Sequence, residues 1–261
     1  MIQDQPDGKR AAGSRQASAI VDAPRGSGRR VRGAVVDFLG ERIVTGAIAV
    51  GETLPGEIQT ADRLDISRGT YREAVKMLAA KGLVESRTKT GTRVLERARW
   101  NLLDPDILRW AFAGKPDAQL VSDLFEMRII VEPAIARLAA LRRDEDQLAE
   151  MQHALATMAQ NGLETEAGRN ADLEFHEAML NASSNEIMKT LGASIGAAVA
   201  YTTLFKQRAA GFPRDPVPDH ERVLKAIEAS DPSAAENAMG ELLRLAQSDT
   251  QEALAEYAAR D

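Results

Sequence analysis

The spacing of apolar side chains predicts three helices in the first hundred residues. Apolar positions recur every three or four residues in the segments 32–45, 57–64 and 68–81, which is the period of an amphipathic helix. Ser67 precedes the third segment and Gly82 follows it. Serine favours the N-cap position and glycine the position just after a helix, so the third helix has a defined start and end.

A β-hairpin is predicted directly after these helices. Residues 83–87 and 92–96 are rich in strand-forming residue types, and the polar segment 88–91 between them ends in glycine. Three helices followed by a two-stranded hairpin make a winged helix-turn-helix, which we assign to residues 30–97. Residues 1–29 contain much Gly, Ser, Pro and Arg without hydrophobic periodicity, so we expect a disordered arm there.

Almost all of residues 104–258 has helical periodicity. This part is predicted to be an all-α bundle of six or seven helices. Turn-forming residues indicate breaks near residues 114–116, 161–162, 183–184, 211–218 and 230–232. The predicted fold class is therefore mainly α, with a winged helix-turn-helix followed by an all-α bundle.

The composition is that of a globular protein and limits the possible chemistry. The chain has 261 residues, of which 44% are hydrophobic, and it has no cysteine. This length suits one large domain or two ordinary ones, and disulfides and thiolate metal sites are excluded. No apolar run approaches the roughly 20 residues that span a bilayer, and the start of the chain lacks the apolar stretch of a secretory signal. We therefore expect a cytoplasmic protein without a membrane partner.

The overall net charge of −6 conceals an asymmetry between the two halves. Residues 1–100 carry 18 Lys and Arg against 12 Asp and Glu, whereas the remaining residues carry 15 against 27. A basic segment joined to an acidic one is typical of a DNA-binding module attached to a second domain.

The start of the third helix is the predicted DNA reader, because the second helix of a helix-turn-helix enters the major groove with its N-terminal residues. Arg68 and Arg72 share one face of this helix, and a bidentate contact from arginine to guanine is worth about 1–3 kcal/mol of discrimination. The alternative for both is a solvated surface position. The predicted DNA contacts are Ser67, Arg68, Thr70, Tyr71 and Arg72, with Lys89 and Gly91 at the tip of the wing.

Three polar residues of the helical part form a candidate site. Asp172 and His176 are four residues apart on a predicted helix, so their side chains point the same way. Such a pair either holds a divalent metal or forms a hydrogen bond within itself. His220 begins another predicted helix after a proline-rich loop, where its side chain can reach a cavity.

The N-terminal motifs resemble those of the GntR family of transcriptional regulators. The resemblance is carried by Leu54-Pro55-Gly56-Glu57, by the run from Ala61 to Ala74, and by Gly82-Leu83-Val84 followed by Gly91-Thr92. It implies double-stranded operator DNA as a partner. Ile58 stands where many members of the family have an arginine, which removes one expected DNA contact.

The helical part resembles the FCD effector domain of the FadR subgroup of that family. The matching stretches are residues 124–136, 172–178 and 219–227. The resemblance implies a metal site of one Asp and three His, with Asp172, His176 and His220 in the first three positions and Leu242 in the fourth. Leucine is not a ligand, so the expectation is zinc with a water or an effector carboxylate completing the shell, or else a metal-free pocket.

The same resemblance implies a role for Arg128. An arginine at this place faces the pocket in FCD domains and meets the carboxylate of the effector, which fits the fork geometry of a guanidinium. The alternative is that Arg128 pairs with Glu132, one turn further on, at the surface. The expected effector-binding residues are Arg128, Asp172, His176 and His220.

Two stretches, residues 100–110 and 131–140, resemble members that regulate genes for galactonate and other sugar acids. This likeness implies a homodimeric regulator, by default a repressor, that responds to a small polyhydroxy carboxylate such as an aldonate. A divalent metal or another small carboxylate as the signal is the alternative. A metal-dependent hydrolase is more remote, because the sequence has no P-loop, nucleophile elbow or glycine-rich dinucleotide loop. We therefore expect no enzymatic activity.

Overall fold

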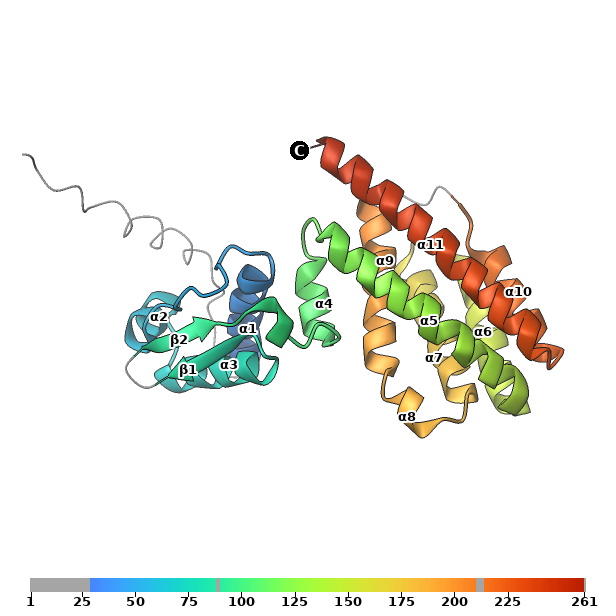
Figure 1. The fold of residues 1–261 in the computed structure, drawn as a ribbon, viewed down its shortest axis with the longest axis horizontal. Helices are drawn as coiled ribbons and strands as arrows, with labels where there is room; N and C mark the ends of the chain where they lie inside the picture. Colours follow the sequence, from blue (N-terminus) through green and yellow to red (C-terminus); the bar gives the residue numbers. More distant parts are fainter. Residues whose placement is uncertain (1–28, 88–89, 210–213, 261) are drawn as a thin grey trace, which may run out of the picture. The chain divides into compact units, whose positions relative to one another are not determined.

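The computed structural model describes residues 29–87, 90–209 and 214–260 (Figure 1). Contacts divide the chain into two compact units, Met1–Asn101 and Leu102–Asp261, which are treated separately below. The arm expected over residues 1–29 lies, except for its last residue, outside the described residues.

The N-terminal unit consists of three helices and a hairpin (Figure 1). Its elements are α1 (Arg29–Val44), α2 (Glu57–Leu64), α3 (Arg68–Ala80), β1 (Val84–Arg87), β2 (Gly91–Val94) and a 3₁₀ turn at Arg97–Arg99. The strands are antiparallel, with Val84 opposite Val94. Fully buried apolar side chains from α1, α3 and the start of β1 form the core of this unit, among them Val35, Leu39, Ile43, Leu78 and Leu83.

Two local features fix the position of α3. Asp65 adopts a left-handed backbone conformation at the end of α2, with φ 52°, which makes the turn between the two helices tight. Gly82 follows α3 with φ +77°, and an added Cβ there would overlap the carbonyl group of Arg99. Only glycine satisfies both conditions at this position.

The C-terminal unit is entirely helical among the described residues. Its helices are α4 (Pro105–Ala111), α5 (Ala118–Arg142), α6 (Glu145–Asn161), α7 (Glu166–Ala182), α8 (Glu186–Lys189), α9 (Gly192–Ala209), α10 (Val217–Glu228) and α11 (Pro232–Arg260). The long helices α5 and α11 run beside each other, and α7 packs against α5, α6 and α9 (Figure 1). The central position of α7 allows its polar side chains to be fully enclosed.

The predicted fold class is confirmed, because a winged helix-turn-helix is followed by an all-α bundle. Two helix boundaries were not predicted, so the described part of this unit has eight helices where six or seven were expected. One lies between the end of α8 at Lys189 and the start of α9 at Gly192. At the other, α5 ends at Arg142 and α6 begins at Glu145, with only two residues between them. Asp144 is the N-cap of α6 and forms a reciprocal capping box with Gln147. A break of this kind needs neither glycine nor proline.

Candidate DNA-reading surface and buried polar site

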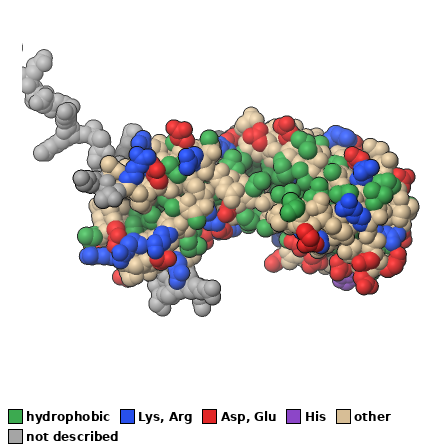
Figure 2. Space-filling view, turned by 60° about the horizontal axis from the view of Figure 1, so that its bottom comes forward, with side chains coloured by type: hydrophobic (Ala, Val, Ile, Leu, Met, Phe, Trp, Pro, Cys, Tyr) green, Lys and Arg blue, Asp and Glu red, His purple; other side chains and the backbone are tan. Residues whose placement is uncertain are grey.

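The first two turns of α3 present two arginines to solvent. Arg68 is exposed, and the side chain of Arg72 is 65% exposed, with its Nε 3.6 Å from Oε1 of Glu57. Ser67 caps the helix, since its Oγ accepts a hydrogen bond from the backbone N–H of Thr70 at 3.0 Å. Lys and Arg side chains gather on part of the face of this unit seen in Figure 2.

Tyr71 does not belong to this exposed set, which corrects the expectation that its hydroxyl reaches DNA. The residue is 4% exposed, and its hydroxyl donates a hydrogen bond to the carbonyl oxygen of Pro55 at 3.1 Å. Burial raises the pKa of Tyr71, a change that a hydrogen bond with Thr60 partly offsets. Tyr71 therefore holds α3 against the segment before α2.

The wing is described only in part. Gly91 is exposed and has φ +82°, and an added Cβ would lie 3.1 Å from Cγ2 of Thr53. Lys89 lies outside the described residues. Arg87 is a further exposed cation on β1, with a side chain 68% exposed and an ion pair of 2.8 Å to Glu85. The sequence analysis did not include it.

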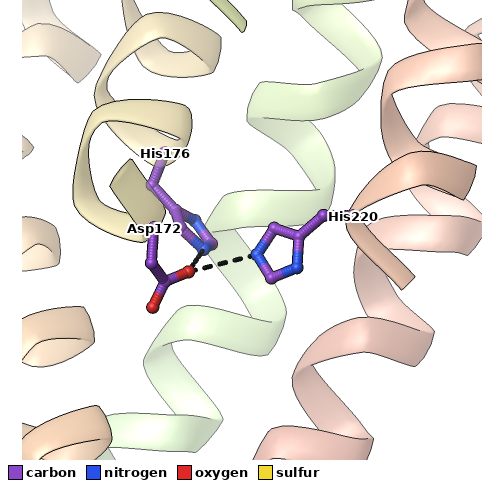
Figure 3. Close-up of side chains that lie close together, drawn as sticks. All are labelled: Asp172, His176 and His220. Carbon is purple, nitrogen blue, oxygen red and sulfur yellow. Dashed lines mark ion pairs between the residues drawn. The ribbon is translucent and has the colours of Figure 1, made fainter. Parts of the chain in front are cut away.

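In the C-terminal unit, Asp172, His176 and His220 come together in the interior (Figure 3). Asp172 and His176 lie one turn apart on α7, and His220 lies in the first turn of α10. Oδ1 of Asp172 is 3.2 Å from Nε2 of His220 and 3.7 Å from Nε2 of His176. All three residues are buried, so the sequence correctly grouped side chains that are almost fifty positions apart.

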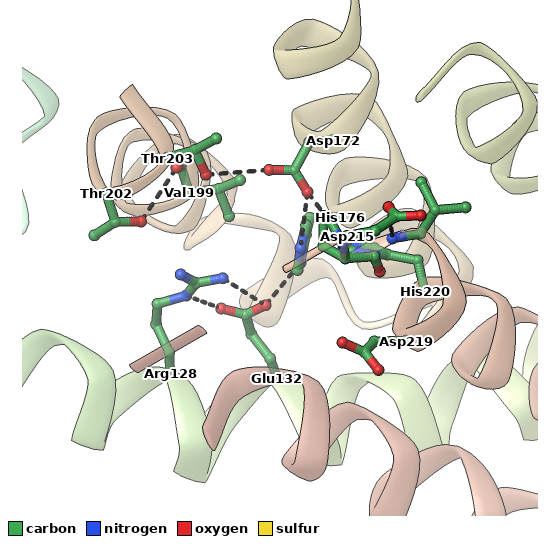
Figure 4. Close-up of polar contacts among 12 residues, drawn as sticks. Arg128, Glu132, Asp172, His176, Val199, Thr202, Thr203, Asp215, Asp219 and His220 are labelled. Carbon is green, nitrogen blue, oxygen red and sulfur yellow. Dashed lines mark hydrogen bonds and ion pairs between the residues drawn. The ribbon is translucent and has the colours of Figure 1, made fainter. Parts of the chain in front are cut away.

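The outer nitrogen of each histidine lies close to an acceptor, and Figure 4 shows the contact of His176 with Glu132. Nδ1 of His176 is 2.8 Å from Oε2 of Glu132, and Nδ1 of His220 is 2.9 Å from the carbonyl oxygen of Pro216. An acceptor beside Nδ1 favours the tautomer that carries its proton there. In this tautomer the Nε2 atoms offer lone pairs to an ion bound beside Asp172, whereas with the proton on Nε2 His220 is placed to donate to Oδ1 of Asp172.

This donor set fits a divalent metal ion. Three possible ligand atoms face one another in the interior. Among the described residues, neither Nε2 of His220 nor Nδ1 of His176 has a well-directed hydrogen-bond partner, although Nδ1 of His176 lies 2.8 Å from Glu132. Ligands bonded to zinc at about 2.1 Å in a tetrahedral shell are about 3.4 Å apart, which is close to the separations from Oδ1 of Asp172. Histidine ligands ordinarily donate their other N–H to a carboxylate or a backbone carbonyl. Nδ1 of His220 forms such a bond with Pro216, and Nδ1 of His176 lies close to the carboxylate of Glu132.

The carboxylate of Asp172 is held in its ionised form. Burial opposes ionisation, but the neighbouring His220, His176 and Lys206 outweigh it and lower the pKa of Asp172 to about 2. Its second oxygen, Oδ2, accepts a hydrogen bond from the hydroxyl of Thr203 at 3.2 Å. Oδ1 is thus the oxygen that faces the two histidines.

Arg128 lies beside this cluster, but its partner is within the protein. Its Nε is 2.5 Å from Oε1 of Glu132, and the side chains of the two residues are 4% and 0% exposed. The alternative of a surface pair is therefore wrong, because the pair is buried. Burial opposes the ionisation of Glu132, but Arg128 and His176 outweigh it and lower its pKa to about 2.

The cluster opens onto a small cavity of about 30 Å³. Helix α9 contributes Val199, Thr202, Thr203 and Lys206 to its lining, and α11 contributes Leu242 and Ala246. Leu242 is 4% exposed, and its side chain offers no ligand atom. The sequence analysis did not predict Glu132 beside His176, although its position one turn after Arg128 was a signal.

The comparisons with known proteins agree with this architecture. Residues 32–94 match the family described as bacterial regulatory proteins, gntR family, and residues 123–245 match the FCD domain. The galactonate operon transcriptional repressor of Escherichia coli K12 is 34% identical over 206 residues, which cover 78% of this chain and 90% of that protein. YieP, an uncharacterized HTH-type transcriptional regulator of the same organism, is 34% identical over 215 residues, covering 80% of this chain and 91% of that protein.

A solved structure shows the same fold at low identity. The structure of Lar, which is described as controlling expression of the Listeria monocytogenes agr system, has a TM-score of 0.60 and is 16% identical. The match covers 88% of this chain and 99% of that one.

A winged helix-turn-helix joined to a helical domain with a buried polar site defines a DNA-binding transcriptional regulator, not an enzyme. The chain belongs to the GntR family of bacterial regulatory proteins, and its C-terminal unit contains an FCD domain. The resemblance predicted from the sequence motifs is thereby confirmed. No helix among the described residues combines the length and hydropathy required to cross a membrane.

Proposed function

We propose that this regulator is a homodimeric repressor of sugar-acid catabolism genes, and that a polyhydroxy carboxylate such as an aldonate releases it from its operator. A relative of 34% identity is named for repression of a galactonate operon, which supports this class of effector. Two copies of the α3 helix would read the two halves of a symmetric operator.

The exposed arginines of α3 carry the DNA-reading part of the proposal. Arg68 and Arg72 are the candidates for base contacts, because both are exposed and lie one turn apart. Thr70 and the backbone at Gly91 are candidates for phosphate contacts, together with Lys89, which lies outside the described residues. The hydroxyl of Ser67 is occupied as the helix cap, so Ser67 contributes through its position at the start of the helix.

The convergence of Asp172, His176 and His220 carries the sensing part of the proposal. Two imidazole nitrogens and one carboxylate oxygen within 4.8 Å of one another are suited to a divalent metal, and zinc is the first candidate. When bound, the ion would supply a Lewis-acidic attachment point for an oxygen of the effector. Because Leu242 offers no ligand atom, one coordination position remains for that oxygen or for water.

The size of the cavity suggests how binding changes the protein. About 30 Å³ accommodates little more than a water molecule. An adjoining cavity of about 340 Å³ shares Leu163, Arg214 and Pro216 with it. Movement of the Arg214 side chain would join the two spaces, so a sugar acid would prefer an altered arrangement around α10. A ligand shifts a conformational equilibrium through such a preference.

The DNA-binding part is tested with double-stranded DNA selected by the full-length protein from a random-sequence pool. We expect the selected sequences to contain a two-fold-symmetric motif, and a gel shift to show binding that D-galactonate or a related aldonate weakens. Arg68→Ala and Arg72→Ala should weaken this binding. Lys225→Ala, which removes a side chain 72% exposed on α10, is their control for general loss of charge. Failure to select any sequence would overturn the DNA-reading assignment.

The metal and effector are tested by titrating zinc and sugar acid separately while thermal stability is followed. Ligands that bind the folded state raise the melting temperature by mass action. We expect His220→Ala to abolish the response to zinc and His153→Ala to retain it, because His153 is exposed on α6. If zinc alone weakens operator binding and no sugar acid does so, the protein is a metal sensor instead.

A further inference from the structure

One face of α9 lines the cavity. Val199, Thr202, Thr203 and Lys206 are spaced by three and four residues, which places them on the same side of the helix. The hydroxyl of Thr202 donates to the carbonyl oxygen of Ala198 at 2.7 Å, and Thr203 donates to Asp172 at 3.2 Å. The hydrogens of both hydroxyls are thus used within the protein, and Lys206 is the remaining polar group of this face.

Lys206 is a buried lysine with no direct partner among the described residues. It is 8% exposed and lines the cavity. Among the residues that the structure describes, no hydrogen bond or ion pair reaches its ammonium group. Burial lowers the pKa of Lys206, an effect that the more distant charges of Asp172 and Asp249 partly offset. Lysine is rarely buried to this extent unless it is paired.

The other two long cations of the cavity lining already have carboxylate partners. Arg128 is bonded to Glu132, with Nε 2.5 Å from Oε1. Arg214 is bonded to Asp219 and, at 3.1 Å, to Asp249. A ligand carboxylate that approached either arginine would have to displace an internal carboxylate, whereas Lys206 requires no such displacement.

The two carboxylates whose charges act on Lys206, those of Asp172 and Asp249, also contact other groups. Both oxygens of Asp172 have other neighbours, because Oδ2 accepts from Thr203 and Oδ1 faces the two histidines. Asp249 accepts from Arg214. The ammonium of Lys206 therefore has unused donor capacity at the wall of a polar cavity. A buried charge without a hydrogen-bonded partner is costly, and an incoming anion would remove that cost.

We infer that Lys206, rather than Arg128, receives the carboxylate of the effector. The inference rests on the proposed function and makes it more specific. The ligand is an anion, so the site accepts an aldonate and rejects the neutral sugar of the same carbon chain. Arg128 is a positioning residue, since it holds Glu132 next to Nδ1 of His176.

The test compares the full-length protein with Lys206→Met, which keeps the length of the side chain and removes its charge. Calorimetric titrations use D-galactonate, D-galactose and zinc as separate probes. We expect galactonate to bind the variant at least about 30-fold more weakly, which is the low end for loss of one partner of a buried charge pair. We expect unchanged or tighter zinc binding, because a positive charge near Asp172 is removed.

The different responses of galactonate and zinc binding separate recognition from a general structural role, which would weaken the binding of both probes. Lys225→Met is the matched control, since its side chain is 72% exposed, and it should bind both probes like the unmodified protein. Equal galactonate affinity in Lys206→Met, or a parallel loss of zinc affinity, would overturn the inference.

Titrations with lactate and citrate, as carboxylates that are not sugar acids, separate this inference from the proposed function. If the unmodified protein binds lactate or citrate in a manner that depends on Lys206, but binds no sugar acid, the sugar-acid proposal fails and the assignment of Lys206 stands. If it binds none of the carboxylates tested, the assignment of Lys206 is wrong, while the DNA-reading surface is unaffected.

Discussion

The two units of this regulator use cations in opposite settings. Arg72 at the start of α3 has a side chain 65% exposed, whereas that of Arg128 in the C-terminal unit is 4% exposed and paired with a fully buried carboxylate. An exposed arginine keeps its hydration and side-chain freedom until DNA arrives. A buried arginine lost both during folding, so its orientation is already fixed before any ligand binds.

The difference matches the two kinds of ligand that we propose, operator DNA and a small carboxylate. DNA is a long polyanion, and exposed cations bind it through many weak contacts in which counterions are released. A small carboxylate offers few contacts, so its site must place each polar group in advance. Four measurements test this contrast, and they are given in order of decreasing expected effect.

The salt dependence of binding should differ most strongly between the two units. Raising the ionic strength from about 50 mM to about 200 mM should weaken operator binding by about a thousandfold or more, because exposed cations compete with salt for phosphates. The affinity for a sugar acid should change far less, since buried charges are poorly screened. Gel shifts and calorimetry at matched salt concentrations measure both. Similar salt dependence of the two affinities would contradict the contrast.

Removal of Glu132 should have the largest effect on stability. Glu132→Ala leaves Arg128 buried without its carboxylate, and breaking such a pair costs about 3–5 kcal/mol of unfolding free energy. Urea unfolding of the full chain measures this change. Glu236→Ala is the control, since that side chain is 50% exposed and lies 3.7 Å from Arg137, and the expected loss is at most about 1 kcal/mol. Equal losses for the two variants would show that burial does not distinguish these pairs.

Substitution of the α3 arginines should affect DNA reading without affecting the fold. Arg68→Ala and Arg72→Ala should each cost about 1–3 kcal/mol of binding and relax the preference at one base position. Binding to a set of operators with single base changes measures this loss. A uniform loss across all operators would instead assign the arginine to a phosphate.

Tyr71→Phe should have the smallest effect, and only on stability. The variant loses the hydrogen bond to Pro55, which is worth about 0.5–1.5 kcal/mol. Operator preference should stay the same, because the hydroxyl does not face solvent. A changed base preference in this variant would restore Tyr71 to the DNA-contact set.

Hydrophobic periodicity predicted most of the architecture, because the period reports which face of a helix is buried. The same period also indicates that Tyr71 is buried, because its spacing from Ala74, Val75 and Leu78 places all four on the buried face of α3. Residue chemistry had suggested a DNA contact, but the position on the helix is the better guide. The boundary between α5 and α6 was missed because a capping box replaces the usual glycine or proline.

The sequence predicted which side chains meet in the buried site, but not how its charged groups pair. Arg128 and Glu132 fall at helical spacing with Phe125 and Ile135, which are fully buried, so their burial was visible in the pattern. Which carboxylate serves which cation depends on distances across α5, α7 and α9, and single-sequence spacing does not contain these. The isolation of Lys206 therefore emerged only from the structure.

The small volume of the cavity beside His220, about 30 Å³, has a consequence for the speed of the response. The proposed sugar-acid effector would enter only after the lining has opened, so the observed association rate should rise with ligand concentration and then reach a plateau at the rate of opening. Above that concentration, additional effector no longer shortens the delay before the operator is released. The time course of induction is then a property of the protein rather than of the nutrient supply.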